Sequence, residues 1–215
     1  MGGARCVRRP VRGRLFRVSA EPQARRPVRL HRGAHRAAHR NLLAQGRAAA
    51  LALGGGLKTG TRIGLLSDTH GLLRPEALEF LRGSDFIVHA GDIGDPAVLE
   101  TLRTLAPLTA VRGNNDRDGW ARAIAETEVL RVDEVSIHVL HDLAELDLDP
   151  AAAGFRVVVS GHSHQPRIDE RGGVLYVNPG SCGPRRFKLP VALAELRVSG
   201  RSVKAKLVEL KISST

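Results

Sequence analysis

The stretch Arg62-Ile-Gly-Leu-Leu-Ser-Asp68-Thr-His70 carries two signals, one for structure and one for chemistry. Up to Ser67 it is a short apolar run, which is typical of a buried β-strand. A carboxylate and an imidazole follow this run directly, two positions apart. Because residues two apart on an extended backbone point to the same side, Asp68 and His70 are predicted to face one common site.

The residues after this stretch predict alternating helices and strands. A helix is predicted over residues 75–81 and a strand over 86–90. Asp95, followed by proline, marks the start of a second helix over 97–105, which precedes a strand over 108–111. Strands dominate the rest of the chain and are predicted over residues 128–132, 135–140, 155–160, 174–177, 191–198 and 203–210. This order predicts an α/β (α+β) fold with a core of two sheets and helices on its outer faces.

Side chains that can bind metal follow five of these strands at their C-terminal ends, where open sheets form ligand sites. They are Asp68, His70, Asp92, Asn114, His141, His162 and His164. Glycine precedes Asp92, Asn114 and His162, which suits tight turns around a charged centre. The set contains nitrogen and oxygen but no sulfur, and it therefore suits divalent Mn, Fe, Ni, Zn or Mg. Seven ligands are too many for one catalytic ion with an open position, so the sequence predicts two divalent ions and a bridging carboxylate.

The order of these motifs resembles the calcineurin-like metallophosphoesterases. It consists of Asp-x-His, Gly-Asp, Gly-Asn-x-Asp, a lone His and Gly-His-x-His, beginning at Asp68 and ending at His164. The later Asn178-Pro-Gly-Ser181 is similar to the small bacterial and archaeal phosphodiesterase group. The resemblance covers residues 61–210 and implies a four-layer αββα sandwich of two mixed sheets.

The resemblance also implies an activity, namely hydrolysis of a small phosphodiester by a hydroxide between two divalent ions, with manganese favoured. One ion is expected at Asp68, His70, Asp92 and His164, and the other at Asp92, Asn114, His141 and His162. No protein nucleophile is required, so Asp92 and Asn114 contribute to catalysis through the metals. Phosphomonoester hydrolysis is one alternative. Another is a non-catalytic metal-binding scaffold, since a eukaryotic retromer subunit of this fold with degraded ligands binds partners.

The chain departs from the family pattern at two positions. Asn115 stands where many members have a histidine, and an amide cannot protonate a leaving group, so the proton donor stays open. Asp142 replaces the usual glycine after the lone histidine. The assignment of His141 as a metal ligand therefore rests on its position at a strand end. Alternation along residues 135–140 puts His141 on the face of the buried valines and His138 on the opposite face.

Several further residues have weaker roles in the sequence prediction. The candidates for orienting ligands or substrate, and for binding phosphate by charge, are Asn178, Ser181, Arg185 and Arg186. His89 is expected to contact the ligands rather than to bind metal, and Asp116 has no assigned role. Cys182 is expected to be a small buried residue, not a nucleophile.

Charge divides the chain into two parts. The net charge of +11 arises from residues 1–60, which hold 14 basic residues and one acidic residue, Glu21; residues 61–215 hold 19 basic and 21 acidic residues. Residues 1–56 are therefore predicted to be a disordered basic extension, and 57–215 a metallophosphoesterase domain. The extension could be an arm for nucleic acid or anionic lipid, a transit peptide, or sequence upstream of a misplaced start, which we favour.

Composition limits the partners and the compartment. Cys6 and Cys182 do not form the spacing of a disulfide framework, which favours a reducing, cytoplasmic setting. No run approaches the roughly 20 apolar residues that span a bilayer, so we expect no membrane partner. The slightly acidic domain favours a small phosphoester substrate over nucleic acid, and the oligomeric state stays open, a homodimer included.

Overall fold

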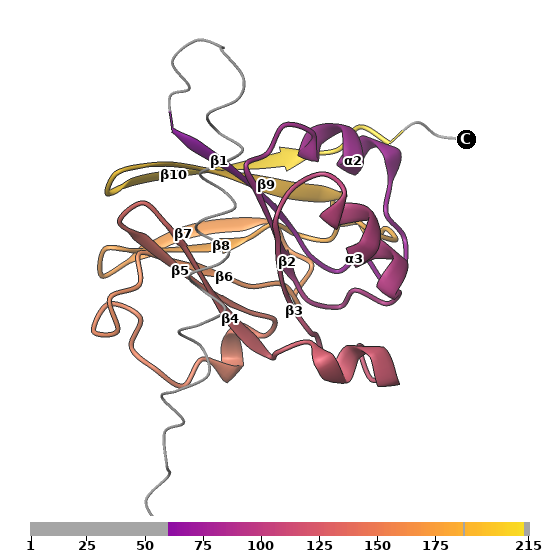
Figure 1. Ribbon diagram of the computed structural model, residues 1–215, viewed down its shortest axis with the longest axis horizontal. Helices are drawn as coiled ribbons and strands as arrows, with labels where there is room; N and C mark the ends of the chain where they lie inside the picture. Colours follow the sequence, from indigo (N-terminus) through magenta and orange to yellow (C-terminus); the bar gives the residue numbers. More distant parts are fainter. Residues whose placement is uncertain (1–59, 187, 213–215) are drawn as a thin grey trace, which may run out of the picture. The chain divides into compact units, whose positions relative to one another are not determined.

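The computed structural model describes residues 60–186 and 188–212 of the chain, and the predictions for residues 1–56 lie outside them. The described part is a sandwich of two five-stranded mixed sheets, shown in Figure 1. Among the described residues, no helix is long and apolar enough to cross a membrane. The predicted two-sheet core is confirmed.

The first sheet has the strand order β10-β9-β1-β2-β3. Its strands are β1 (Thr61–Leu66), β2 (Phe86–Ala90), β3 (Leu108–Val111), β9 (Ala192–Ser199) and β10 (Ser202–Glu209). Strands β1, β2 and β3 are parallel, as the predicted βαβ pattern requires, whereas β9 and β10 form an antiparallel hairpin that pairs with β1.

The second sheet has the strand order β4-β5-β6-β8-β7. Its strands are β4 (Thr127–Val132), β5 (Val135–Leu140), β6 (Val157–Val159), β7 (Arg167–Arg171) and β8 (Val174–Asn178). Strands β5, β6 and β8 are parallel, and β4 and β7 pair antiparallel at the two edges. Strand β7 was not predicted, because its sequence Arg-Ile-Asp-Glu-Arg lacks the apolar alternation of a half-buried strand.

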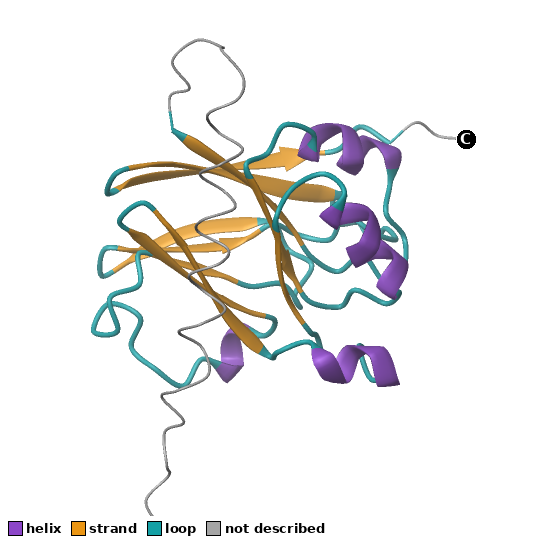
Figure 2. Cartoon of the chain, viewed as in Figure 1, coloured by secondary structure: helices purple, strands orange, loops and turns teal. Residues whose placement is uncertain are grey.

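Helices cover the outer face of the first sheet, as Figure 2 shows. They are α2 (Pro75–Leu81) and α3 (Pro96–Arg103), and Asp95 caps α3 through its side chain as predicted. Two short 3₁₀ helices follow, η1 (Gly119–Ala123) and η2 (Leu143–Glu145). The αββα sandwich is thus confirmed, with a thin outer layer of η2 and loops on the second sheet.

Period-2 alternation divides the apolar residues of each strand between two cores. The core between the sheets includes Ile63, Leu65, Val88, Ala90, Ile137, Val139, Val157, Val159, Ala194 and Leu196. The core between the first sheet and the helices includes Leu66, Ala77, Leu81, Ile87, Leu99, Leu102 and Leu193. Gly64 lies on the face of β1 that points to the helices, where a Cβ would come within 2.4 Å of Leu81 Cδ2, so the absence of a side chain lets α2 pack closely on β1.

Asp116 ties together the loops that follow β2 and β3. Its carboxylate is only 6% exposed and accepts hydrogen bonds from the backbone N–H groups of Ile93 (3.1 Å), Gly94 (2.9 Å) and Gly113 (2.8 Å). Hydrogen bonds to an ionised acceptor are stronger than neutral ones. The carboxylate therefore fixes the distance between two loops that carry predicted metal ligands.

We predict that Asp116→Asn lowers the free energy of unfolding by about 2–3 kcal/mol, because an amide N–H₂ then faces buried N–H donors and leaves them unpaired. Asp118→Asn is the matched control, since Asp118 is exposed and its side chain caps no helix N–H. Urea denaturation of both variants checks the prediction. Coinciding unfolding curves for Asp116→Asn and the wild type would contradict it.

Candidate metal centre

The seven predicted ligands lie beyond the C-terminal ends of parallel strands in both sheets. Strand β1 leads to Asp68 and His70, β2 to Asp92, β3 to Asn114, β5 to His141, and β6 to His162 and His164. Parallel strands present their carboxyl ends along one edge, so side chains from distant parts of the sequence meet there. The structure brings all seven together, four from the first sheet and three from the second.

One group of ligands forms around Asp68. Its Oδ1 lies 3.2 Å from His164 Nε2, and the rings of His70 and His164 stack with their centroids 5.3 Å apart. Ligand atoms of Asp68, His70 and His164 all lie within 4.8 Å of one another, which is close enough for one cation.

A second group forms around Asn114. Its Oδ1 lies 3.1 Å from His141 Nε2 and 3.0 Å from His162 Nδ1. The rings of His141 and His162 meet edge to face with their centroids 5.3 Å apart. An amide oxygen and two imidazole nitrogens are hard and borderline ligands that suit a divalent ion.

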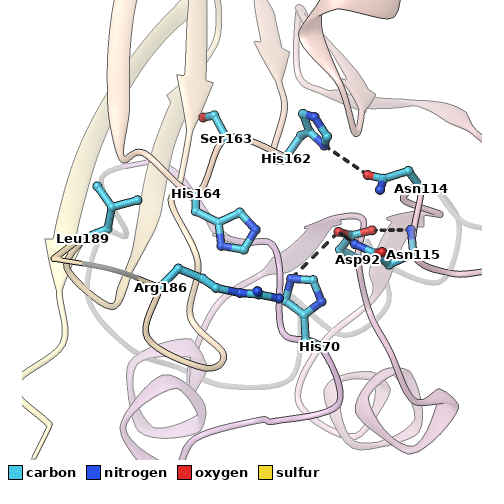
Figure 3. Close-up of a pocket in the computed structure, with 9 residues that line it drawn as sticks. All are labelled: His70, Asp92, Asn114, Asn115, His162, Ser163, His164, Arg186 and Leu189. Carbon is cyan, nitrogen blue, oxygen red and sulfur yellow. Dashed lines mark hydrogen bonds and ion pairs between the residues drawn. The ribbon is translucent and has the colours of Figure 1, made fainter.

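Asp92 lies between the two groups, as Figure 3 shows. Its Oδ2 is 3.8 Å from His70 Nε2, and its Oδ1 is 3.5 Å from His141 Nε2. The backbone N–H of Asn115 donates to Oδ1 (2.9 Å), and the Asn115 side-chain amide donates to Oδ2 (2.5 Å). One carboxylate oxygen therefore faces each group, which is the arrangement a bridging ligand needs.

Buried polar atoms test whether the first group fits a cation. Both carboxylate oxygens of Asp68, Nε2 of His70 and Nδ1 of His164 are buried and have no hydrogen-bond partner among the described residues. Buried polar groups without partners are rare in folded proteins and demand an explanation. A divalent cation coordinated by these residues would satisfy them, so the residues present fit a metal ion.

Burial sets the protonation state of the first group. Desolvation raises the pKa of Asp68 to about 6, and it lowers the pKa of His164 to about 4. Desolvation also lowers the pKa of His70. Neutral imidazole is the form that binds metal, so these two histidines are ready to coordinate at neutral pH.

Hydrogen bonding sets the charge of the second group. Burial would raise the pKa of Asp92, but the neighbouring His141, 3.5 Å away, and the hydrogen bonds from Asn115 hold it well below its usual range. Burial would lower the pKa of His141, but Asp92 and the backbone carbonyl of Ala90 raise it above the ordinary value. The carboxylate of Asp92 is therefore ionised and oriented by its neighbours.

The ligand loops store backbone strain. Among the described residues, six non-glycine residues have positive φ, and five of these are predicted ligands. The five are Asp68 (φ 55°), His70 (45°), Asp92 (53°), His162 (65°) and His164 (57°). Such conformations cost roughly 1–2 kcal/mol per residue, and strain of this kind concentrates at functional sites. Backbone hydrogen bonds from Asp68 N to Gly91 O (3.0 Å) and from His70 N to Asp92 O (2.9 Å) hold the first two loops in place.

Close packing around the carboxylates leaves no room for side chains at two glycines. A Cβ on Gly113 would lie 2.2 Å from Asp92 Oδ1, and a Cβ on Gly161 would lie 2.8 Å from Asp68 Oδ2. Real Cβ atoms do not approach other atoms this closely. The expectation that glycines make room for the charged centre is confirmed at these two positions.

His89 supports the loops and is not among the clustered ligands. Its Nδ1 accepts from the backbone N–H of Gly91 (3.2 Å), so Nε2 carries the proton and donates to Thr69 Oγ1 (2.9 Å). Thr69 in turn donates to the carbonyl of Ile93 (2.9 Å). Burial lowers the pKa of His89 to about 3, which keeps it neutral in this chain of hydrogen bonds. His138 lies on the other side of β5, where it contacts Phe155.

The clustered ligands open into a cavity of about 310 Å³, drawn in Figure 3. Its walls are His70, Asp92, Asn114, Asn115, His162, Ser163, His164, Arg186 and Leu189. Of the two candidate phosphate-binding arginines, the structure places Arg186 in the wall and Arg185 outside it. The sequence could not separate these neighbours, because charge alone does not tell which one points inward.

Two of the candidate substrate residues form hydrogen bonds that hold loops in place, and one of them, Asn178, also lines a second cavity. Asn178 donates through its amide to the carbonyl of Gly161 (2.6 Å) and to Ser163 Oγ (3.0 Å). Ser181 is buried and its hydroxyl donates to the carbonyl of Asp68 (2.9 Å). We therefore assign Ser181 to holding the Asp68 loop, since a buried and bonded hydroxyl cannot reach substrate. Cys182 is also fully buried, and burial raises the pKa of its thiol to about 12, as expected for a residue that is not a nucleophile.

The comparisons with known proteins agree with this geometry. Residues 61–200 match the model of the calcineurin-like phosphoesterase superfamily domain. The chain is 32% identical over 158 residues to a protein of Methanothermobacter thermautotrophicus named "Probable metallophosphoesterase", which covers 68% of this chain and 91% of the relative. It is 28% identical over 139 residues to a phosphodiesterase of Methanocaldococcus jannaschii, which covers 56% of this chain and 84% of the relative.

Solved structures show the same fold at lower identity. Vacuolar Protein Sorting 29 from Cryptosporidium parvum superposes with a TM-score of 0.62 at 19% identity, over 73% of this chain and 95% of that one. Because the family model spans most of the described domain and an archaeal relative exceeds 30% identity, the chain belongs to the calcineurin-like phosphoesterase superfamily.

Proposed function

We propose that the chain is a phosphodiesterase that holds two divalent metal ions, with Asp92 between them, and hydrolyses small phosphodiesters. The observation that carries this proposal is the position of Asp92, whose two oxygens face two separate groups of ligands. Asp68, His70 and His164 would hold one ion, and Asn114, His141 and His162 the other. The nitrogen and oxygen ligands suit manganese, which we favour. When bound, two such ions lower the pKa of water and neutralise charge on the phosphoryl oxygens.

The side chains around the ligands have complementary tasks. The guanidinium of Arg186 lines the cavity beside His70 and His164, where it can donate two hydrogen bonds to a phosphoryl group. Asn115 keeps the Asp92 carboxylate in one orientation through its two hydrogen bonds. Among the residues that the structure describes, the cavity wall contains no histidine, acid, tyrosine, cysteine or lysine beyond the ligands themselves. Apart from the ligands, its wall therefore offers no group suited to protonate a departing alkoxide.

We predict a strong preference for diesters with good leaving groups. A general acid contributes about 10²- to 10⁴-fold to rate, and an aryl oxide can depart without one. The rate on bis-p-nitrophenyl phosphate should therefore exceed that on dialkyl phosphates by more than this margin, and a series of aryl esters should show rates that fall steeply with leaving-group pKa. Equal rates on aryl and alkyl esters would contradict the absence of a proton donor.

We predict that Asp92→Asn abolishes diester hydrolysis, with a loss of about 10³-fold or more in kcat, since an amide cannot bridge two cations as a charged ligand does. Metal analysis should show fewer bound ions per chain. Asp118→Asn, which changes an exposed carboxylate outside the cavity wall, is the matched control and should retain activity. A wild-type protein inactive with Mn²⁺, Ni²⁺, Zn²⁺ and Mg²⁺ would instead favour a binding scaffold.

We predict that the titration of Asp68 destabilises the metal-free protein as pH rises from about 4 to 7, in opposition to His89 and His164, whose lowered pKa values add stability over this range. The pKa of Asp68 is raised from 3.8 unfolded to about 6 folded, so the folded state binds its proton more tightly. Below the unfolded pKa the carboxyl group is protonated in both states and does not change the free energy of unfolding. Once the pH exceeds the folded pKa, the buried charge lowers the free energy of unfolding by on the order of 3 kcal/mol.

Asp68→Asn isolates this effect, because it removes the titration and keeps the shape. Urea denaturation in a chelator should show the variant gaining stability over the wild type as pH rises, and losing the stabilisation that added Mn²⁺ gives the wild type. A constant difference between the two proteins from pH 4 to pH 8 would refute the assignment.

A further inference from the structure

A second cavity of about 230 Å³ adjoins the first, and the two share His162 and Ser163 in their walls. It runs from the ends of β6 and β8 along the outer face of the second sheet towards β7. Apart from the shared His162, neither the ligand set nor the hydrolytic chemistry uses this cavity. A phosphodiester has two arms, and the second cavity offers a place for one of them beside the ligands.

The outer part of the second cavity is built by the pairing of β7 with β8. Antiparallel register puts Asp169 opposite Tyr176, and alternation along β7 brings Arg167, Asp169 and Arg171 to one face. Asp169 accepts a hydrogen bond from Arg171 (3.0 Å) and forms an ion pair with Arg167 (2.7 Å), and these contacts lower the pKa of its carboxyl group. The unpredicted strand therefore delivers two guanidinium groups to the cavity, each paired with Asp169.

The guanidinium of Arg171 is a preformed stacking surface. It lies over the ring of Tyr176, with Cζ 5.0 Å from the ring centroid, and Asp169 holds it from the side. The Arg171 side chain is 57% exposed, so part of the guanidinium stays open to the cavity. A planar group that stacks there pays little ordering entropy, because the arginine is already held in position.

Charge in the second cavity favours a neutral ligand. Its wall contains the cations Arg167 and Arg171 and the anions Asp142 and Asp169, which balance one another. A second phosphate would meet two carboxylates, whereas a neutral ring would meet a guanidinium face. Gln165 and Ser163 add donors and acceptors for the polar edge of such a ring.

We propose that the second cavity is a subsite for a nucleoside arm, and that the preferred substrates are phosphodiesters of nucleosides. The base stacks on Arg171, its edge contacts Gln165, and the sugar passes His162 and Ser163 to reach the phosphorus. The cavity is smaller than the roughly 300–1,000 Å³ typical of drug-sized ligands, which suits one nucleoside rather than an oligonucleotide. This inference rests on the proposed phosphodiesterase function.

The test compares two chromogenic esters with the same leaving group, thymidine 5′-(p-nitrophenyl phosphate) and methyl p-nitrophenyl phosphate. The ratio of their kcat/KM values reports the nucleoside arm alone. Since stacking of one base contributes roughly tenfold or more to affinity, the ratio should fall about tenfold in Arg171→Ala/Tyr176→Leu, which removes both stacked groups. An unchanged ratio overturns the subsite.

Two further variants make the comparison specific. Arg201→Ala is the matched control, because Arg201 is 86% exposed and pairs with Glu134 on a different hairpin. Its ratio should equal that of the wild type. Arg171→Lys keeps the charge and loses the planar group, so its ratio should fall like that of the double variant. A wild-type ratio in Arg171→Lys would mean that the cavity recognises an anion, which contradicts the proposal.

A binding measurement separates this inference from the activity. Ligand-observed NMR with thymidine and metal-free protein should show binding to the wild type and loss of binding in Arg171→Ala/Tyr176→Leu. If neither ester is hydrolysed while thymidine binding depends on these residues, the proposed function fails and the subsite stands. If both esters are hydrolysed and thymidine binds the variant and the wild type equally, only the subsite fails.

Discussion

The rest of this structure depends on two carboxylates, Asp68 and Asp92, that share a site sheltered from water with ligand atoms less than 4.8 Å apart. Like charges at this separation repel strongly, and burial adds a desolvation cost to each. The two carboxylates meet these costs differently. Asp92 is stabilised by two hydrogen bonds from Asn115 and by His141, 3.5 Å away, whereas the oxygens of Asp68 have no hydrogen-bond partner among the described residues and the pKa of Asp68 is raised. The charge of Asp68, unlike that of Asp92, would therefore need a bound cation to be stabilised.

Hydrogen bonds between the ligand loops offset the unfavourable free energy of the site. Left-handed backbone at five ligands and an unpaired buried carboxylate both disfavour the folded state. Asp116, His89 and Thr69 oppose this by joining the ligand loops through hydrogen bonds. Each of these three residues contacts backbone, not ligand side chains, so they fix loop positions and leave the ligand atoms free.

Much of the fold and most of the ligand cluster were predictable because apolar runs end directly before the ligands. Asp68, Asp92 and His162 each follow a strand with buried residues, so an apolar run followed by a polar ligand predicts both the strand and the site. Strand β7 escaped prediction because its stability comes from edge pairing and ion pairs, which leave no apolar period. The role of Asp116 and the difference between Arg185 and Arg186 depend on tertiary geometry, which no local pattern contains.

The ligands come from both sheets, with Asp68, Asp92 and Asn114 on one and His141 and His162 on the other. Ions held between them would therefore act as rivets that join the two halves of the sandwich along one edge. Separation of the two sheets would require release of the ions first. Metal-bound protein should therefore unfold slowly and resist proteases, while metal-free protein unfolds readily. The lifetime of the protein in its cell would then follow the supply of metal, and shortage would remove the molecule itself as well as its activity.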